Sequence, residues 1–503
     1  MKKFKDIITK NKYNIYIFIG MMIITTVMCT NFIKPHFALD TYCVYSFDNY
    51  ELIIHFLLSN RLVSAFSKWI FHMLKIPFLI NMEILSIAGI LFLTISWFIL
   101  YKFTVNKSNK HDDILFNIFI GAIFFIIIYN FCTVECLAFW ESGIICLGIL
   151  CTVIATCLFN LNIKYNKLIT FIFLLLASIC YQGAITLFIP LALIFLAYKN
   201  KEINKENIKR ITIESIKVGI IYIIVMIINL VATRIFSTMF SYEFRKIEAL
   251  SIVEILNTIA RLGTDMCIKT FGILPKFLYV LIIASISAIV FLYIFKKKKK
   301  KFYILEYIIL IVSCILIPIL PMLATPIESQ YMESRMAISF GASIGIALLF
   351  FILILEGDKC KCYKNFIKII TCGMILINST YFIIASSEML ATNYLDRNVA
   401  QKIDNEISEY EVRTGMCIEN IGLTFDKEPT FNYTGQRWLG VINTRSMATE
   451  WAAIETIELY SGKSYNKVEV PDKYKEEFKQ KDWSNFNEEQ LVFVDNNLYI
   501  CLF

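Results

Sequence analysis

The chain has 503 residues, of which 57% are hydrophobic and 18% charged, with a net charge of +8 and a mean hydropathy of +0.62. This composition excludes a water-soluble globule, whose surface needs about 25% charged residues. The apolar residues occur in runs of about twenty, the length that an α-helix needs to cross a bilayer, whereas barrel strands would alternate over about ten residues. We therefore expect a polytopic α-helical membrane protein.

Eleven apolar runs predict transmembrane helices when they are considered together with the flanking basic residues. In chain order they are 14–33, 80–100, 114–130, 143–161, 168–181, 183–198, 213–233, 274–295, 302–322, 338–355 and 366–386. The stretch 168–198 could form one long helix or two short ones that turn at Tyr181-Gln182-Gly183. Two helices are favoured, because one helix would place the lysine run Lys296–Lys301 outside, against the positive-inside bias.

Basic residues set the orientation. When the charges near span ends are counted with the adjoining loops, the predicted cytoplasmic loops hold 26 Lys and Arg and the outer loops hold 11. The amino terminus is therefore predicted to be cytoplasmic, in a multi-pass protein of the cell membrane. The first span is longer than a typical signal-peptide core, and Thr30–Lys34 offers no small-residue cleavage site, so we interpret this span as an anchor.

Residues 387–503 differ from the rest, with 12 basic and 20 acidic residues against 37 and 21 in residues 1–386. This predicts a transmembrane domain over 1–386, with a long first outer loop at 34–79, followed by a small extracytoplasmic α/β domain. Helical spacing covers Leu390–Tyr410 and Ser446–Tyr460. Short strands are predicted at Met416–Phe425 and Val468–Val470, and a hairpin at Leu491–Phe503. Within this domain Cys417 and Cys501 could form a disulfide or remain free buried thiols.

The first outer loop carries three of the four histidines and an amphipathic pattern over Leu52–Leu74, which predicts a helix along the membrane surface. Asp40 follows the first span among apolar neighbours. An acid there is poorly hydrated and becomes a stronger base, so Asp40 is a candidate general base; a solvated loop aspartate is the alternative. His36, Asp40 and His55 also allow a divalent metal site, although interfacial histidines are common without one.

Other polar residues lie at the predicted outer ends of later spans. Arg61 and Arg335 suit a phosphate, because a guanidinium binds anions through a bidentate fork; the alternative is that both extend to the headgroups. Tyr181 and Gln182 interrupt an apolar hairpin, where Gln182 needs a hydrogen-bond partner. Glu135 lies in the loop after the third span, and acidic and aromatic residues there suit a carbohydrate. No nucleotide-binding loop is present, and no nucleic-acid partner is expected.

This arrangement resembles the bacterial membrane glucosyltransferases related to the prophage O-antigen glucosyltransferase II, within the type C glycosyltransferase superfamily. The similar stretches are Phe37–Asp48, Asn60–Phe71, Glu135–Phe159, Leu174–Phe188, Tyr331–Gly341 and Leu491–Phe503. Because they are distributed from residue 37 to residue 503, the resemblance covers most of the chain. Two positions depart from the family pattern: Thr41 replaces a second acid after the aspartate, and Asn60 replaces a glycine before Arg61.

The resemblance implies a type C fold and transfer of a hexose, such as glucose, on the outer face from a polyprenyl-phosphate donor to a cell-surface glycan. Asp40 would then be the catalytic base, Arg61 and Arg335 would hold the donor phosphate, and Tyr181, Gln182 and Glu135 would contact substrate. No cofactor is assigned, and a divalent metal is an open alternative. A lipid-linked glycan flippase or transporter is the alternative function, and a polysaccharide polymerase is a third.

Overall fold

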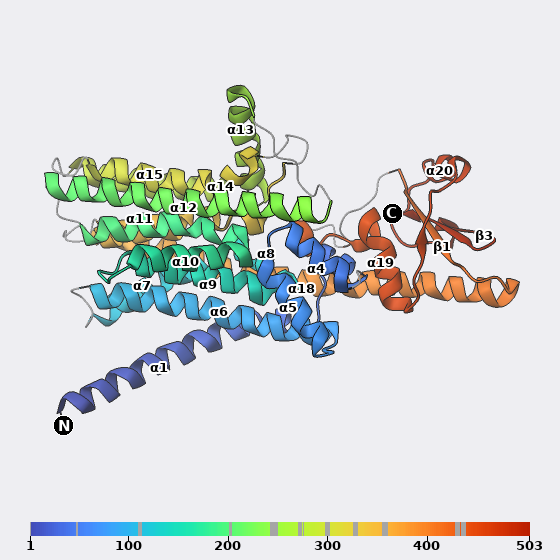
Figure 1. Cartoon of the computed structure of the whole chain (residues 1–503), viewed down its shortest axis with the longest axis horizontal. Helices are drawn as coiled ribbons and strands as arrows, with labels where there is room; N and C mark the ends of the chain where they lie inside the picture. The colour runs from blue at the N-terminus through green and yellow to red at the C-terminus, as the bar shows by residue number, and fades with distance from the viewer. Residues whose placement is uncertain are drawn as a thin grey trace. The chain divides into compact units, whose positions relative to one another are not determined.

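The computed structural model of the chain is shown in Figure 1. It describes residues 2–46, 49–108, 113–200, 204–241, 250–269, 274, 276–296, 302–324, 330–354, 361–427, 433 and 439–503. Asp48 and most of the lysine run, Lys297–Lys301, lie outside the described residues. The chain divides into two compact units, each described by itself below.

The first unit comprises Met1–Ile33, Ile53–Leu137 and Glu141–Ile383. Its helices are α1 (Lys2–Met28), α2 (Thr30–Ile33), α4 (Asn49–Leu58), α5 (Leu62–Met73), α6 (Phe78–Lys107), α7 (Ile114–Ile128), α8 (Phe131–Ala138), α9 (Ser142–Phe159), α10 (Asn166–Cys180), α11 (Phe188–Lys199), α12 (Lys205–Met239), α13 (Ile252–Lys269), α14 (Lys276–Lys296), α15 (Phe302–Leu316), α16 (Ile338–Gly341) and α17 (Ser343–Ile354). Short 3₁₀ turns are η1 (Gln182–Leu187), η2 (Leu320–Ala324) and η4 (Ser334–Met336).

Among the described residues, six helices are long and apolar enough to cross a membrane, and the α7–α8 pair, bent by 56°, would be a seventh. The six segments are Phe78–Lys107, Ser142–Phe159, Gln182–Lys199, Lys205–Met239, Leu278–Phe295 and Asn365–Thr414. Four shorter apolar helices are Tyr13–Met28, Asn166–Cys180, Phe302–Leu316 and Ser343–Ile354. Each predicted run therefore overlaps a helix. The helical membrane class is supported, while eleven crossings and their orientation stay predictions.

Helices α6, α9 and α10 form the packed centre of the first unit, with α9 contacting both of the others. Close approach of α6 and α9 requires a glycine at Gly143, because a Cβ there would lie 2.6 Å from the carbonyl oxygen of Leu85. On the other side, Ala155 of α9 and Ala177 of α10 belong to a buried apolar cluster that also includes Phe188 of α11. Small residues thus bring these helices together closely.

Two helix breaks place polar residues in this unit. Helix α10 ends at Cys180, and Tyr181 is extended before η1 begins, which confirms the predicted break at Tyr181-Gln182-Gly183. Between α7 and α8, the Asn130 side chain accepts a hydrogen bond from the Cys132 N–H at 2.9 Å and donates to the Ile127 carbonyl at 2.8 Å. These bonds satisfy backbone groups that the bend would leave open, and they orient α8.

The sequence predicted one amphipathic helix in the first outer loop, but the structure has two. Helix α4 ends at Leu58 and α5 begins at Leu62, with Asn60 in the left-handed region at φ 54°. Asparagine tolerates this conformation better than most residues, because its short polar side chain can hydrogen-bond locally. The apolar spacing continues across the break, which is why the hydrophobic pattern did not reveal it.

The second unit comprises Lys34–Leu52, Ala138–Trp140 and Ile384–Phe503. Its elements are α3 (Leu39–Ser46), the later part of α18 (Lys361–Thr414), α19 (Glu450–Ser461), α20 (Asp472–Phe478), and the strands β1 (Asn420–Phe425), β2 (Asn466–Lys467), β3 (Leu491–Val494) and β4 (Asn497–Leu502). The sheet order is β2-β1-β4-β3, with β1 parallel to both neighbours and β3 antiparallel to β4. Its core includes Ile403, Ile421, Ile454 and Leu498.

The predicted hairpin over Leu491–Phe503 is confirmed, and so are the two helices of the tail. The strand predicted at Val468–Val470 is wrong by a few residues, because pairing with β1 occurs at Asn466–Lys467, although the Val468 N–H still donates to the Ile421 carbonyl at 3.0 Å. Cys417 and Cys501 are free thiols. Cys501 is buried, but Cys417 is exposed, contrary to the expectation of two buried thiols.

The division into units differs from the predicted division at residues 386 and 387. Lys34–Leu52, Ala138–Trp140 and residues 384–386, predicted to be part of the transmembrane domain, pack in the second unit. There α3 contacts α19, and Phe37 exchanges two backbone hydrogen bonds with the Asn393 side chain, at 2.8 and 2.7 Å. The unit boundaries fall inside α4 and α18, so no linker composition marks them in the sequence.

Candidate active site

The helix break at Asn60 places Arg61 at the amino-terminal end of α5. The Asn60 amide donates to Asn229 Oδ1 on α12 at 2.5 Å, and Ser178 of α10 donates to the same oxygen at 3.3 Å. All three side chains are buried. A buried polar network of this kind holds the break in a fixed position. Because Arg61 directly follows Asn60, the network also fixes the backbone position of Arg61.

Arg61 forms an ion pair with Glu141, which lies immediately before α9. The second carboxylate oxygen of Glu141 accepts a hydrogen bond from Ser64 Oγ of α5 at 2.5 Å. Glu141 is almost fully buried. Its charge is therefore balanced by the guanidinium, by a hydroxyl donor and by the positive end of the α9 dipole.

Arg335 forms a second pair of the same kind. Its guanidinium contacts Glu135 Oε1, and its backbone N–H donates to Glu135 Oε2 at 3.3 Å. Glu135 is carried by the short helix α8 and is 2% exposed, while Arg335 lies in η4. Two segments that are 200 residues apart in the sequence are thus joined by a buried charge pair.

Tyr181 and Gln182 lie between the two pairs. The Arg61 guanidinium carbon is 5.3 Å from the centre of the Tyr181 ring, a cation–π contact. Gln182 Nε2 donates to the Ser59 carbonyl at 3.4 Å, which supplies the partner that the sequence required for it. Next to them, a Cβ on Gly183 would lie 2.7 Å from the Arg335 carbonyl oxygen, so η1 and η4 approach closely only because Gly183 has no side chain.

These residues line a cavity of about 50 Å³, which we name the arginine pocket. Its lining comprises Ser59, Arg61, Tyr181, Gln182, Gly183, Thr186, Pro318, Pro321, Met322, Tyr331, Arg335 and Met336. The volume admits a few water molecules or a phosphate-sized group, whereas pockets that enclose a whole small ligand measure about 300 Å³ or more. Four of the six predicted site residues therefore share one pocket, and a fifth, Glu135, is paired with Arg335.

The arrangement can bind an anion. A guanidinium has five N–H donors in a planar fork, so Arg61 can contact an acceptor besides Glu141. Buried carboxylates also fix each guanidinium in place, so little side-chain freedom is lost when a ligand binds. The arginine pocket thus offers two positioned cations and the amide of Gln182 around a phosphate-sized space.

Asp40, the sixth predicted site residue, is half-buried near the start of α3 and belongs to the second unit. Burial, together with the negative charges of Glu455 and Asp40, raises the pKa of the nearby Cys43 thiol to about 12. His36 is fully buried and its Nδ1 donates to the Lys34 carbonyl at 2.7 Å. Within the described residues, no group of three or more His, Cys, Asp or Glu could hold a metal ion. The residues His36, Asp40 and His55 therefore do not form the metal site that the sequence allowed.

Sequence reasoning missed how the two arginines are held. Glu141 is one of the acidic and aromatic residues that the sequence associated with a carbohydrate, and its partners Arg61 and Ser64 come from a segment about eighty residues earlier. The signal for Asn229 was available, since it is an amide within an apolar run, and such residues need a hydrogen-bond partner in a membrane.

Comparison with known proteins found no matching family model, no matching curated protein and no matching solved structure.

Proposed function

We propose that this chain is a membrane glycosyltransferase that moves a hexose, glucose in the simplest case, from a polyprenyl-phosphate donor to a cell-surface glycan on the outer face. The resemblance of the sequence to the membrane glucosyltransferases suggests the reaction. The arginine pocket is the observation that supports it best, because two arginines held by buried carboxylates surround a phosphate-sized space.

The proposed reaction is a displacement at the anomeric carbon. A hydroxyl of the acceptor glycan forms the new bond to this carbon while the bond to the donor phosphate oxygen breaks, and the polyprenyl phosphate leaves with the bonding electrons. The hydroxyl proton passes to Asp40 as general base. Arg61 and Arg335 stabilise the charge that develops on the departing phosphate, which is commonly the largest contribution to such a rate enhancement.

The role of Asp40 in this proposal rests on the sequence, whereas the role of the arginines rests on the arginine pocket. The two parts can therefore be tested separately. If both are right, Asp40→Asn abolishes transfer while donor lipid is still bound, and loss of an arginine weakens donor binding as well as transfer.

The experiment is transfer of labelled glucose from polyprenyl-phosphate glucose to cell-envelope glycan, in membranes that contain the full chain or a variant. Arg335→Gln alone would leave Glu135 buried without its partner, so the informative variant is Glu135→Gln with Arg335→Gln, which removes both charges. We expect this double variant and Asp40→Asn each to lose transfer by about a hundredfold or more, as removal of one oxyanion donor does in other enzymes.

Arg413→Gln is the matched control, because it removes an exposed arginine at the end of α18. It should retain the transfer activity. Full activity of the Glu135→Gln, Arg335→Gln double variant, at wild-type expression, would rule out donor-phosphate binding by Arg335. Full activity of Asp40→Asn would rule out the assigned base.

The alternative, a lipid-linked glycan flippase or transporter, is favoured by a different observation. A cavity of about 380 Å³ between α11, α12 and α15 is mostly apolar and includes Glu306. Both carboxylate oxygens of Glu306 are buried, and neither has a hydrogen-bond partner within the described part of the chain. Ionisable residues in such an environment commonly mark transport pathways.

Glu306→Gln separates the two functions. A transporter that depends on this carboxylate would lose lipid flipping in reconstituted vesicles, whereas the proposed transferase would keep its transfer activity because Glu306 is not part of the arginine pocket. If the wild-type chain flips lipid but has no transferase activity, and Glu306→Gln loses the flipping, the transporter function is established.

The outer position of the tail, which the proposed function requires, can be tested through its cysteines. Cys417 is exposed, whereas burial raises the pKa of Cys501 to about 12 and keeps it unreactive. A membrane-impermeant maleimide added to intact cells should label Cys417, and Cys417→Ser should remove that label. Labelling of Cys417 only after the cells are opened would reverse the predicted orientation.

A further inference from the structure

A further cavity lies at the ends of three helices in the first unit, and we name it the lysine cavity. It has a volume of about 430 Å³ and is lined by Phe103, Lys107, Asn160, Leu161, Asn162, Phe195, Tyr198 and Lys199. These residues come from the carboxyl-terminal ends of α6, α9 and α11 and from the loop after α9. All three helix ends precede loops that the basic-residue count predicts to be cytoplasmic.

The two lysines of this cavity have neutral partners. Lys107 Nζ donates to the Asn160 carbonyl at 3.1 Å and lies 4.0 Å from the centre of the Phe103 ring. Lys199 Nζ donates to Asn162 Oδ1 at 2.7 Å. The positive charges of Lys107 and Lys199 repel each other across the cavity, and no carboxylate lines it among the residues described.

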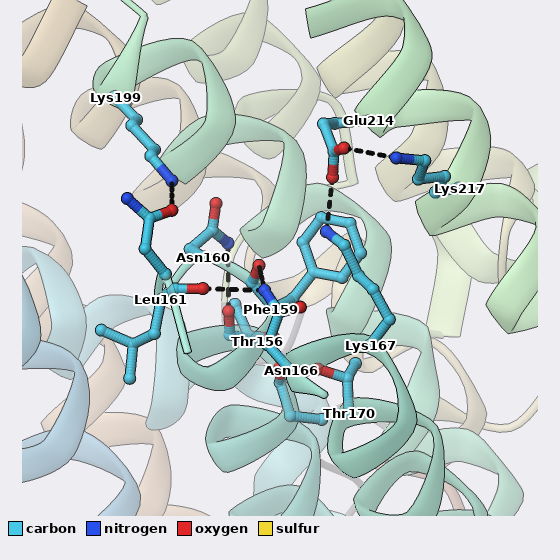
Figure 2. Close-up of polar contacts among 12 residues, drawn as sticks. Thr156, Phe159, Asn160, Leu161, Asn166, Lys167, Thr170, Lys199, Glu214 and Lys217 are labelled. Carbon is cyan, nitrogen blue, oxygen red and sulfur yellow. Dashed lines mark hydrogen bonds and ion pairs between the residues drawn. The ribbon is translucent and has the colours of Figure 1, made fainter. Parts of the chain in front are cut away.

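The carboxylate that interacts with Lys199, Glu214, is already shared by other lysines. Glu214 of α12 forms ion pairs with both Lys167 and Lys217, as Figure 2 shows. Arg210 adds a further repulsion to Lys199, which Glu214 only partly offsets. The environment of Lys107 and Lys199 is thus net positive, so an anion that enters the cavity would be attracted to it.

The polar wall of the cavity is rigid and includes an acceptor. Asn160 Nδ2 donates to the Thr156 carbonyl at 3.0 Å, and the Asn166 amide donates to the carbonyls of Phe159 and Leu161 at 3.3 and 2.7 Å, as Figure 2 shows. The Asn160 carbonyl in turn accepts the hydrogen bond from Lys107 Nζ, so this wall holds the lysine at the cavity.

Part of the cavity lining is aromatic. Phe103 and Phe195 contact each other edge to face, with ring centres 5.0 Å apart, and Tyr198 lies one helical turn beyond Phe195. Two cations, a fixed amide and an aromatic wall, at the end of membrane helices, match a lipid headgroup better than a free anion, because the aromatic wall favours the apolar part of a lipid.

We propose that the lysine cavity binds the phosphodiester headgroup of an anionic phospholipid, with Lys107 and Lys199 at the phosphate. This inference does not depend on the proposed transferase function. The probe is phosphatidylglycerol, which carries this phosphodiester and one negative charge. The measurement is the amount retained by the full-length protein after purification from bilayers of phosphatidylcholine with added phosphatidylglycerol, counted by native mass spectrometry.

Lys107→Gln and Lys199→Gln should each lower phosphatidylglycerol retention about fivefold, and together about twenty-fivefold, the usual effect of single basic residues at an anionic bilayer. Lys164→Gln with Lys217→Gln is the matched control, because it removes the same charge from nearby positions that do not line the cavity. Equal retention by both double variants would overturn the site.

A second variant leaves both lysines in place. Asn162→Asp puts a carboxylate where Lys199 already donates a hydrogen bond, and so neutralises this lysine without changing its position. Retention should fall about fivefold, as for Lys199→Gln; wild-type retention would contradict the proposal. Inorganic phosphate added in excess should displace little lipid, and full displacement by phosphate would assign the cavity to a soluble anion instead of a headgroup.

Discussion

The arginine pocket and the lysine cavity are both cationic, yet their charges are held in opposite ways. Each arginine meets a carboxylate that is almost fully buried, Glu141 for Arg61 and Glu135 for Arg335. Each lysine meets a neutral oxygen, from Asn160 or Asn162. The arginine pocket is therefore charge-balanced before any ligand arrives, whereas the lysine cavity carries an excess of positive charge.

This difference teaches what each region is suited for. A buried charge pair adds little to stability on its own, but it fixes geometry and becomes costly when one partner is lost. Such a pair suits a site where a phosphate must be held in one orientation during a reaction. Flexible lysines with excess charge suit an anion that needs attraction more than orientation, such as a lipid headgroup.

The largest expected effect follows from breaking one pair. Arg335→Gln leaves Glu135 buried without a cation, so we expect a loss of about 3 to 5 kcal/mol in the free energy of unfolding. Lys107→Gln should change it by less than about 0.5 kcal/mol, because nothing buried depends on this lysine. Thermal unfolding of the purified full chain in detergent, or its yield from membranes, measures both.

The double variant Glu135→Gln with Arg335→Gln serves as the control for this prediction. It restores neutrality and should recover most of the lost stability, because two amides can hydrogen-bond where the ion pair was. If Arg335→Gln is as stable as the wild type, the Arg335–Glu135 pair does not hold η4 against α8, and the contrast with the lysine cavity disappears.

The next effect comes from the close approach of η1 and η4. In Gly183→Ala the added Cβ would lie 2.5 Å from the Tyr181 ring and 2.7 Å from the Arg335 carbonyl oxygen, so the arginine pocket must deform. We expect a loss of about 1 to 3 kcal/mol in stability, together with weaker transfer. Gly219→Ala on α12 is the control, because nothing lies within 4 Å of its Cβ position and alanine favours helix.

A stability loss confined to Gly183→Ala would show that the arginine pocket depends on this backbone contact. Equal stability of the two alanine variants would mean that η4 can move away from η1 without cost. Retention of phosphatidylglycerol should be unchanged in both variants, since neither position lines the lysine cavity.

The features that could be predicted from the sequence are those set by local patterns. Runs of about twenty apolar residues gave the positions of the helices, and the polar pair Tyr181-Gln182 inside such a run gave the break between α10 and η1. The hairpin of β3 and β4 followed from alternating residues around Asp495-Asn496. The grouping of Arg61, Arg335, Tyr181 and Gln182 followed from a family resemblance and not from spacing.

The features that could not be predicted depend on contacts between distant residues. Arg335 and Glu135 are 200 residues apart, and nothing in either segment names the other as its partner. The break at Asn60 needs the buried amide of Asn229, while the apolar spacing continues through it. The attachment of the segment before α3 to α18 likewise involves Phe37 and Asn393, which are 356 residues apart in the sequence.

A smaller effect concerns ionic strength. Raising the salt from about 0.01 M to about 1 M shortens the screening distance from about 30 Å to about 3 Å. The exposed ammonium groups of Lys107 and Lys199 should feel this change, so phosphatidylglycerol retention should fall severalfold. The Arg335–Glu135 pair is shielded from water, so the stability difference between Arg335→Gln and wild type should stay nearly constant. If the phosphatidylglycerol retention and the stability difference both depended on salt, the two regions would not differ in how strongly water and ions screen their charges.

The smallest effect concerns a carboxylate whose hydrogen-bond donor is a backbone N–H. Glu458 of α19 accepts from the Tyr465 N–H at 2.8 Å, and burial raises its pKa, with Glu455 adding repulsion. Because the pKa is raised in the folded state, Glu458 favours folding at low pH, and this contribution is lost as the pH rises through the raised pKa. Glu458→Gln should remove this loss, since glutamine stays neutral.

The buried thiol Cys501 reports the opening of the sheet, because it reacts only when β4 is exposed. Both chains to be compared are full-length and carry Cys417→Ser, and one of them also carries Glu458→Gln. The Cys501 labelling rate in the chain that keeps Glu458, divided by the rate in the Glu458→Gln chain, cancels the intrinsic pH dependence of the thiol reaction. We expect this ratio to be near one in acid and to rise with pH. A ratio that does not change with pH would mean that hydrogen bonding from Tyr465 offsets the burial of Glu458, and that a buried carboxylate in this protein needs no cation to remain charged.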